Sequence, residues 1–155
     1  MRRKTFILVI ISALLFTSCQ NSVIFEKYNK IPEYKWQYNN KESFTFRIKD
    51  TTTTYNVYLN LRHTGNYQFS NIWIMIYIKN PDGKISFKRH EFTLAAIDGK
   101  WLGQGMGDIM DHKLIFEKNL RFSEGEYTIV LQHDMRMDEL PSIMDVGISI
   151  EKSQP

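Results

Sequence analysis

The sequence predicts an all-β protein, an antiparallel β-sandwich of seven to eight strands in an immunoglobulin-like or a jelly-roll arrangement. Aromatic residues make up 14% of the 155-residue chain, and such residues favour strands. From residue 42 onward, apolar and polar residues alternate with a period of two, which is typical of strands with one buried face. Turn residues separate these runs, as they do in sandwiches.

The alternation locates the strands in order along the chain. It is clearest at residues 55–61, where one face should be buried. Between residues 72 and 78, isoleucines occupy one face while Trp73, Met75 and Tyr77 occupy the other. A strand that is apolar on both faces should lie inside a sheet and be covered on both sides.

A turn follows directly at Asn80-Pro81-Asp82-Gly83. Proline presets the backbone at the second position and glycine accepts a positive φ, so residues 84–94 should return as an antiparallel strand. The remaining predicted strands lie at residues 44–48, 113–116, 127–133 and 146–151.

The N-terminus has the three parts of an export signal. A basic start at residues 2–4 precedes an apolar run at residues 6–16, which is shorter than the roughly 20 residues that a spanning helix needs. Residues 15–19 then resemble a lipobox. They predict a signal peptide at residues 1–18 and lipid attached to Cys19. The alternative is an ordinary secretory signal followed by a stray cysteine.

Cysteine content and charge agree with a lipoprotein. Cys19 is the only cysteine, so no disulfide framework is available to a secreted domain, and several acyl chains on it would give stable membrane attachment. Three of the 20 basic residues lie in the signal, which leaves 17 basic and 17 acidic residues. This balance indicates no nucleic-acid partner. We expect residues 19–40 to form a lipidated, partly ordered strap and residues 41–155 to form the sandwich domain.

One segment, residues 98–108, breaks the alternation. Its glycines allow backbone conformations that other residues avoid, but their spacing is not that of a dinucleotide-binding or phosphate-binding loop. The segment is predicted to be either a long crossover between strands, fixed by a tryptophan, or a loop that binds a partner. The candidate partner-binding residues in it are Trp101, Gly103, Gly105, Gly107 and Asp108.

The polar residues do not indicate a catalytic or metal site. The four histidines, His63, His90, His112 and His133, lack the short paired spacing of metal motifs, although the strands of a sandwich could still bring two of them together. No Gly-x-Ser-x-Gly motif is present, and no serine adjoins a histidine. We therefore expect no enzyme activity, no catalytic residue, no metal and no cofactor.

Short motifs distributed along the chain carry a resemblance to a known family. They are Ile31-Pro32 with Trp36, residues 46–51, residues 59–62, Tyr67 with Ser70-Asn71, residues 98–108, and Met135-Arg136 with Asp145-Val146-Gly147. In order and spacing they resemble GldH, a family of gliding-motility lipoproteins from Bacteroidetes. The resemblance covers nearly the whole chain after the signal, and its motifs are structural rather than catalytic.

The resemblance implies a non-enzymatic lipoprotein of the cell envelope that works with the gliding machinery and, through it, with type IX secretion. Its implied partners are other envelope proteins of this apparatus and the membrane. Residues 20–26 contain one acidic residue, whereas surface-exported lipoproteins of this group carry an acidic cluster there, so the domain should face the periplasm. Thr51, in Asp50-Thr51-Thr52, resembles the short acceptor for protein O-glycosylation in Bacteroidetes.

Two functions remain open from the sequence. The first is a scaffold or assembly subunit that docks onto partner proteins, and the second is a glycan-binding module that uses aromatic residues. Tyr58 is the candidate ring best placed for exposure, because it lies on the polar side of an alternating strand. A flat exposed aromatic row would favour glycan binding, whereas an apolar edge strand or patch would favour docking.

Overall fold

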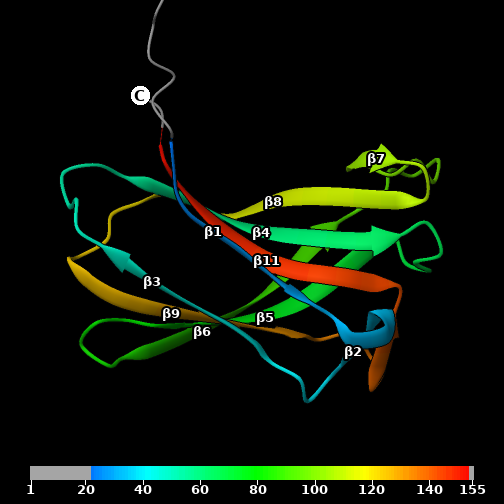
Figure 1. Cartoon of the computed structure of the whole chain (residues 1–155), viewed down its shortest axis with the longest axis horizontal. Coiled ribbons are helices and arrows are strands. Elements are labelled where there is room, and N and C mark those ends of the chain that lie inside the picture. The colour runs from blue at the N-terminus through cyan, green and yellow to red at the C-terminus, as the bar shows by residue number, and fades with distance from the viewer. Residues whose placement is uncertain (1–21, 154–155) are drawn as a thin grey trace, which may run out of the picture.

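The computed structural model describes residues 22–153, which form eleven β-strands and one short 3₁₀ helix (Figure 1). The elements are β1 (Val23–Lys30), η1 (Pro32–Tyr34), β2 (Lys35–Gln37), β3 (Glu42–Ile48), β4 (Tyr55–Thr64), β5 (Asn71–Lys79), β6 (Ile85–Thr93), β7 (Gln104–Met106), β8 (Ile109–Leu120), β9 (Gly125–His133), β10 (Glu139–Pro141) and β11 (Ile143–Lys152). The predicted all-β antiparallel sandwich is confirmed, with more strands than the seven to eight expected. Within the described region, no helix is long and apolar enough to cross a membrane.

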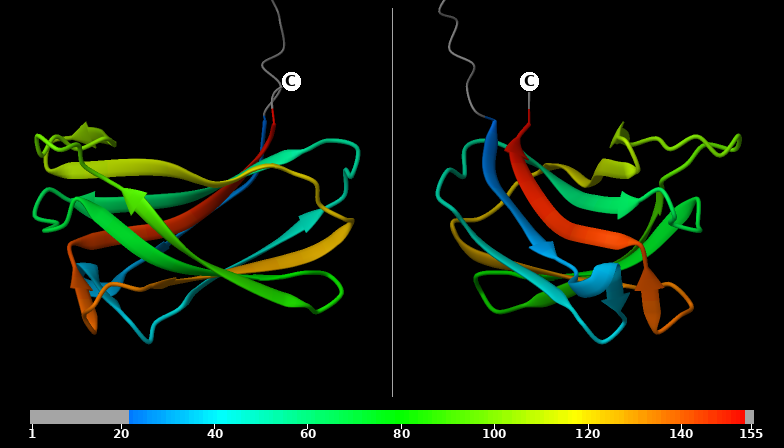
Figure 2. Two further views of the ribbon diagram at one scale, coloured as in Figure 1. Left: turned by 180° about the vertical axis from the view of Figure 1, so that it is seen from behind. Right: turned by 45° about the vertical axis from the view of Figure 1, so that its right-hand side comes forward.

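Two main sheets pack face to face (Figures 1 and 2). The five-stranded sheet has the order β1-β11-β4-β8-β7, the four-stranded sheet has the order β3-β9-β5-β6, and β2 with β10 forms a separate two-stranded sheet. The eight long strands therefore face one another as β1-β11-β4-β8 and β3-β9-β5-β6, which is the strand order of a jelly roll. Of the two arrangements that the sequence left open, the structure has this one.

Four of the eleven strands had no counterpart in the sequence prediction. β2, β7 and β10 contain three residues each, too few to show a period of two. β1 pairs with β11 but exposes most of its residues at the edge of the sheet, so its pattern does not alternate clearly. The strap predicted for residues 19–40 therefore includes strands of the sandwich from residue 23 onward.

The hairpin between β5 and β6 is confirmed. The Asn80 N–H donates to the Lys84 carbonyl at 2.8 Å, and the Gly83 N–H donates to the Asn80 carbonyl at 2.9 Å. Gly83 has a φ of 83°, which residues with a Cβ rarely adopt. The two strands then pair antiparallel from Lys79 opposite Ile85 to Asn71 opposite Thr93.

The expectation that both faces of β5 are covered is wrong. β5 lies inside the four-stranded sheet, between β9 and β6, and Ile72, Ile74 and Ile76 are buried against the other sheet. The opposite face, with Trp73 and Tyr77, is only half-buried. Because no further layer covers this face among the described residues, its aromatic rings form part of the surface.

The core lies between the two main sheets. Alternate residues of β3, β4, β9 and β11 point inward and are buried, among them Phe44, Leu59, Leu61 and Ile148. Trp36 is completely buried and donates from Nε1 to the Asn40 carbonyl at 2.8 Å. Burying each such side chain contributes about 1.5–3 kcal/mol, so this core accounts for the stability of the sandwich.

The two ends of the sandwich differ in what they contain. The end at which β1 begins and β11 finishes, here called the tether end, also holds the loop from β3 to β4 and the turn of the β5–β6 hairpin. The opposite, distal end holds η1, β7 and the connection from β6 to β7 (Figure 1). The described part of the chain begins at residue 22, at the tether end.

Candidate functional site

The glycine-rich segment is a crossover at the distal end. It leaves β6 in the four-stranded sheet and enters the five-stranded sheet at β7. The Leu102 N–H donates to the Leu94 carbonyl at 2.8 Å, and Ala95 pairs with Trp101 as an isolated bridge. A narrow loop therefore folds back on itself before β7 and β8 form their own hairpin. The structure has the crossover, which was one of the two interpretations of this segment.

Trp101 attaches this crossover to the sandwich. Its ring is half-buried and lies 4.6 Å from the ring centroid of His63 and 6.4 Å from that of Tyr67. Tyr67 is itself buried and donates from its hydroxyl to the Asn71 carbonyl at 3.0 Å. Most of the indole surface is thus used for internal packing, and the exposed apolar side chains of the loop are those of Ile97 and Leu102.

The glycines of the segment have packing roles. A Cβ at Gly103 would lie 2.5 Å from the Asp111 carbonyl oxygen and 2.8 Å from Nε2 of His112, so the loop can contact β8 only without a side chain here. Gly107 turns between β7 and β8 with a φ of 62°, and Gly105 adjoins the Met110 side chain. The Asp108 carbonyl accepts the Gly65 N–H at 2.6 Å, while its side chain is exposed. Partner binding by these residues stays a prediction.

Beneath the crossover lies a pair of histidines. His63 on β4 and His112 on β8 are buried, their Nε2 atoms are 3.0 Å apart and their rings are inclined by 18°. His63 Nδ1 also lies 2.8 Å from the Thr64 carbonyl. Burial lowers the pKa of both rings, that of His112 to about 4, so near pH 7 they share one proton as neutral donor and acceptor. The sequence did not identify this pair, because the two residues are 49 positions apart.

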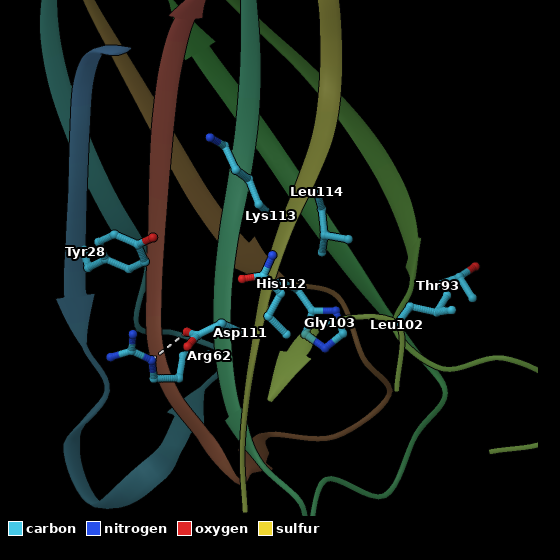
Figure 3. Close-up of a pocket in the computed structure, with 10 residues that line it drawn as sticks. Tyr28, Arg62, Thr93, Leu102, Gly103, Asp111, His112, Lys113 and Leu114 are labelled. Atoms are coloured by element: carbon cyan, nitrogen blue, oxygen red, sulfur yellow. Dashed lines mark hydrogen bonds and ion pairs between the residues drawn. The ribbon is translucent and has the colours of Figure 1, made fainter. Parts of the chain in front are cut away.

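A cleft of about 560 Å³ is lined in part by His112 of this pair (Figure 3). Tyr28, Arg62 and Asp111 line it on the outer face of the five-stranded sheet, and it continues around β8 to Leu102 and Leu114. Arg62 Nε donates to Asp111 at 2.6 Å, and this hydrogen bond raises the pKa of the guanidinium. The charges of Arg62 and Asp111 in the cleft wall therefore already neutralise each other. Within residues 22–153, no three His, Cys, Asp or Glu side chains are arranged to hold a metal.

A second open region, the β6–β8 flank, runs along one side of the sandwich. It consists of residues 79–93, which include β6, and residues 112–121 of β8 and the loop after it. Among the described residues, β6 pairs only with β5, and β8 beyond Asp111 pairs only with β4. Lys88 and Glu117 span the gap with 3.9 Å between Nζ and Oε1. In the view from behind, the edges of β6 and β8 both face the reader (Figure 2).

The flank contains its own cavity at the tether end. It measures about 380 Å³ and lies between the sheets, with side chains from β5, β6, β8 and β9 around it. Its lining residues include Ile78, Ser86, Leu120, Phe122 and Tyr127. The two sheets are therefore not fully closed against each other on this side.

Apolar side chains are exposed on the outer face beside this flank. Ile85 and Phe87 on β6 have exposed fractions of 64% and 70%, and the Tyr77 ring lies 6.0 Å from that of Phe87. With Trp73 on the same face of β5, these residues form what is here called the β6 patch. Cations cover two of its rings: Arg89 Cζ lies 3.8 Å from the Trp73 centroid, and Lys41 Nζ lies 4.9 Å from the Tyr77 centroid.

The remaining candidate residues lie apart from this patch. Tyr58 is half-buried on the outer face of β4, with Lys113 Nζ 4.7 Å above its ring. Thr51 is exposed in the loop between β3 and β4, at the tether end. Cys19 lies outside the described residues. The sequence did not single out the β6 patch, because an alternating strand does not reveal which of its apolar residues remain uncovered.

Comparison with solved structures gives only distant likenesses. A family GH115 4-O-methyl-α-glucuronidase has a TM-score of 0.45 and 9% identity, with 88% of this chain and 18% of that chain covered. Latent PorU from Porphyromonas gingivalis has a TM-score of 0.39 and 7% identity, with 88% and 14% covered. Likenesses of this size carry no argument about function.

Sequence comparisons are much closer. The family model described as GldH lipoprotein matches residues 23–150. A gliding motility lipoprotein GldH homolog from Christiangramia forsetii is 34% identical over 152 residues, 93% of each chain. The gliding motility lipoprotein GldH from Flavobacterium johnsoniae is 29% identical over 159 residues, covering 98% of this chain and 99% of that one. The resemblance seen in the sequence motifs is confirmed: this chain belongs to the GldH lipoprotein family.

Proposed function

We propose that this chain is a lipoprotein anchored to the bacterial cell envelope, which acts in gliding motility as a non-enzymatic scaffold by docking onto other proteins of the gliding and type IX secretion machinery. The names of its relatives, gliding motility lipoproteins, support the envelope anchor and the role in motility. The observation that carries the docking mechanism is the β6 patch, an exposed apolar surface on an edge strand whose outer edge pairs with no described strand. Exposed apolar patches mark interaction sites, and open strand edges are templates for pairing with another chain.

The anchor and the patch are arranged so that both can be used together. In the proposal, lipid on Cys19 holds the protein, and only residues 20–22 separate it from β1. Four peptide steps extend to about 14 Å at most, so the tether end stays near the membrane surface. β6 runs from the tether end toward the distal end, and its outer face stays accessible from the side. We place this face in the periplasm.

Glycan binding is the alternative, and neither the rings of the β6 patch on β5 nor Tyr58 favours it. Sugars stack on the open faces of aromatic rings, but cations lie over Trp73, Tyr77 and Tyr58. A sugar would have to displace each cation and the stabilisation of about 0.5–1 kcal/mol that such a contact gives at an exposed site. Protein docking has no such competition at Ile85 and Phe87, which are the most exposed members of the patch.

A matched pair of variants tests the docking proposal. Phe87 and Ser43 lie at opposite ends of one row across the four-stranded sheet, Ser43-Val130-Tyr77-Phe87, and both are exposed on its outer face. Phe87→Asp and Ser43→Asp would each replace the chromosomal copy. Membranes would be solubilised in mild detergent, and the mass distribution of the anchored protein would be measured by native electrophoresis.

We expect the unchanged protein and Ser43→Asp to migrate in a large assembly and Phe87→Asp to migrate as a monomer. Assembly of the unchanged protein and of both variants would show that the β6 patch does not dock. A monomeric wild type would remove the docking proposal altogether.

A further inference from the structure

We propose that the free edge of β6 binds an extended, acidic segment of a partner protein, which adds to the four-stranded sheet as a further strand and covers the β6–β8 flank. This inference rests on the docking function proposed above and specifies its mode. Strand addition takes its affinity largely from main-chain hydrogen bonds and its specificity from alternate side chains. The backbone, the side chains and the charge of the flank each support it.

The register of the hairpin fixes which backbone groups of β6 are free. The Asn80 N–H donates to the Lys84 carbonyl, and hydrogen-bonded pairs recur at every second residue of an antiparallel ladder. The even-numbered residues of β6 therefore bond to β5. Ile85, Phe87 and Arg89 direct their N–H and C=O groups away from β5, toward an edge at which no described strand pairs. An incoming strand would find a continuous row of unused donors and acceptors.

The side chains of the same residues point to the outer face of the sheet. A strand paired with Ile85 and Phe87 would place alternate side chains beside them, and apolar residues there would cover the most exposed part of the β6 patch. Its other side chains would point toward the gap next to Ser86 and Lys88, where the cavity of about 380 Å³ opens. The ligand is thus a segment with one apolar face and one polar face.

Charge indicates what the polar face carries. The two segments of the flank, residues 79–93 and 112–121, contain seven basic and three acidic residues, although the chain after the signal is balanced. Within residues 22–153, Lys79, Lys118 and Arg121 form no ion pair. Acidic side chains on the incoming strand would complement this excess, since opposite charges on adjacent strands stabilise pairing.

A proline substitution separates strand addition from docking by side chains alone. Phe87→Ala removes the side chain and keeps the N–H, whereas Phe87→Pro removes both. Proline is tolerated on edge strands where the N–H faces solvent. The full-length anchored protein would be expressed from its own locus in each form, and the assembled fraction would be measured in detergent-solubilised membranes by native electrophoresis.

Strand addition predicts that Phe87→Pro weakens assembly about tenfold more than Phe87→Ala does, the factor expected for one lost interface hydrogen bond. Equal losses in the two variants would overturn strand addition and leave docking through the patch intact. Full assembly of both variants, together with Phe87→Asp, would overturn the docking function itself.

A second pair guards against loss of folding at residue 87. Glu91 has the same backbone direction as Phe87 but lies four residue pairs nearer the distal end. Glu91→Pro should reduce assembly more than Glu91→Ala if the added strand extends this far along β6, and thermal unfolding of each variant would verify that the sandwich is intact. Equal assembly in both Glu91 variants, together with equal losses at Phe87, would overturn the proposal.

Discussion

Both flanks of the sandwich are formed by edge regions of the two main sheets, but only one of the two flanks is closed. On one flank β1 lies against β3: the Phe25 and Phe46 rings are 5.6 Å apart, and Asn29 donates to Glu42 at 2.8 Å. On the β6–β8 flank, the Lys88–Glu117 pair spans 3.9 Å and a cavity remains. One flank is closed by packing, and the other is held open by edges that do not meet.

The outer side chains at the two edges of the four-stranded sheet also differ. On β3 they are polar, with Ser43, Thr45 and Arg47, whereas on β6 they include Ile85 and Phe87. Natural proteins usually protect edge strands with polar or charged side chains, because exposed apolar edges promote association. β3 follows this rule, and β6 follows it only in part. The exposed apolar edge is therefore specific to β6 and is not shared by β3, the other edge strand of the same sheet.

The largest expected effect distinguishes the residues of β6 that bond to β5 from those that face the free edge. Lys88 should bond to β5 through its backbone, so Lys88→Pro should remove a ladder hydrogen bond, leave its partner unsatisfied and lower the free energy of unfolding by about 3 kcal/mol. Phe87→Pro, one residue away, should cost much less, since its N–H faces the free edge. Urea denaturation of both variants checks this. Equal losses would mean that the free and bonded sides of β6 have been assigned incorrectly.

The next effect concerns the crossover that closes the distal end of the open flank. Trp101→Ala should lower the free energy of unfolding by about 2 kcal/mol, less than for a fully buried tryptophan, because the ring is half-buried against His63 and Tyr67. Leu102→Ala, at the exposed neighbouring position, should change it by less than about 0.5 kcal/mol. Thermal melts of both variants test the difference, and a wild-type melt for Trp101→Ala would assign the ring to a partner instead.

Acidic pH should loosen the loop after β6 before the loop after β3. Burial lowers the pKa of His63 and of His112, so the unfolded state binds more protons as pH falls below 6.5, and stability is lost down to about pH 4. Asp111, which is exposed on β8, opposes these shifts only in part. Hydrogen bonds from Lys152 and Thr52 hold the pKa of Asp50, in the loop after β3, well below its usual value.

At pH 5 we therefore expect a loss of about 1 kcal/mol in the opening free energy of residues 94–103 and no loss at residues 49–54. Amide hydrogen exchange at pH 5 and pH 7, corrected for the intrinsic rate, measures both. Replacing both histidines with asparagine should remove the pH dependence, and equal responses of the two loops would contradict this account.

The smallest expected effect is on the stability of the patch itself. Phe87→Thr should change the free energy of unfolding by less than about 0.5 kcal/mol, because the side chain is already exposed, while solubility at high concentration should rise. Phe44→Thr, buried on β3, serves as the contrast and should cost about 3 kcal/mol. A large loss for Phe87→Thr would show that the ring supports the fold.

The sandwich could be predicted from the sequence because the alternation with a period of two and the Asn80–Gly83 turn are local signals. The jelly-roll strand order could not be predicted, since it depends on contacts between segments that are distant in the sequence. β1 was not predicted because an exposed edge strand alternates weakly. The pairing of His63 with His112 needed the register of β4 and β8, and the exposure of Phe87 depends on the absence of a covering layer among residues 22–153. Trp101 was correctly expected to fix the crossover, but its contacts could not be predicted.

Crosslinking in intact cells tests most directly whether the open flank is the docking edge. A photoreactive amino acid would replace Phe87 in one strain and Ser43 in another, in the anchored protein expressed at its native level. The account predicts one discrete adduct, formed at residue 87 and not at residue 43. Adducts of equal yield at both positions, or an adduct at residue 43 alone, would contradict it.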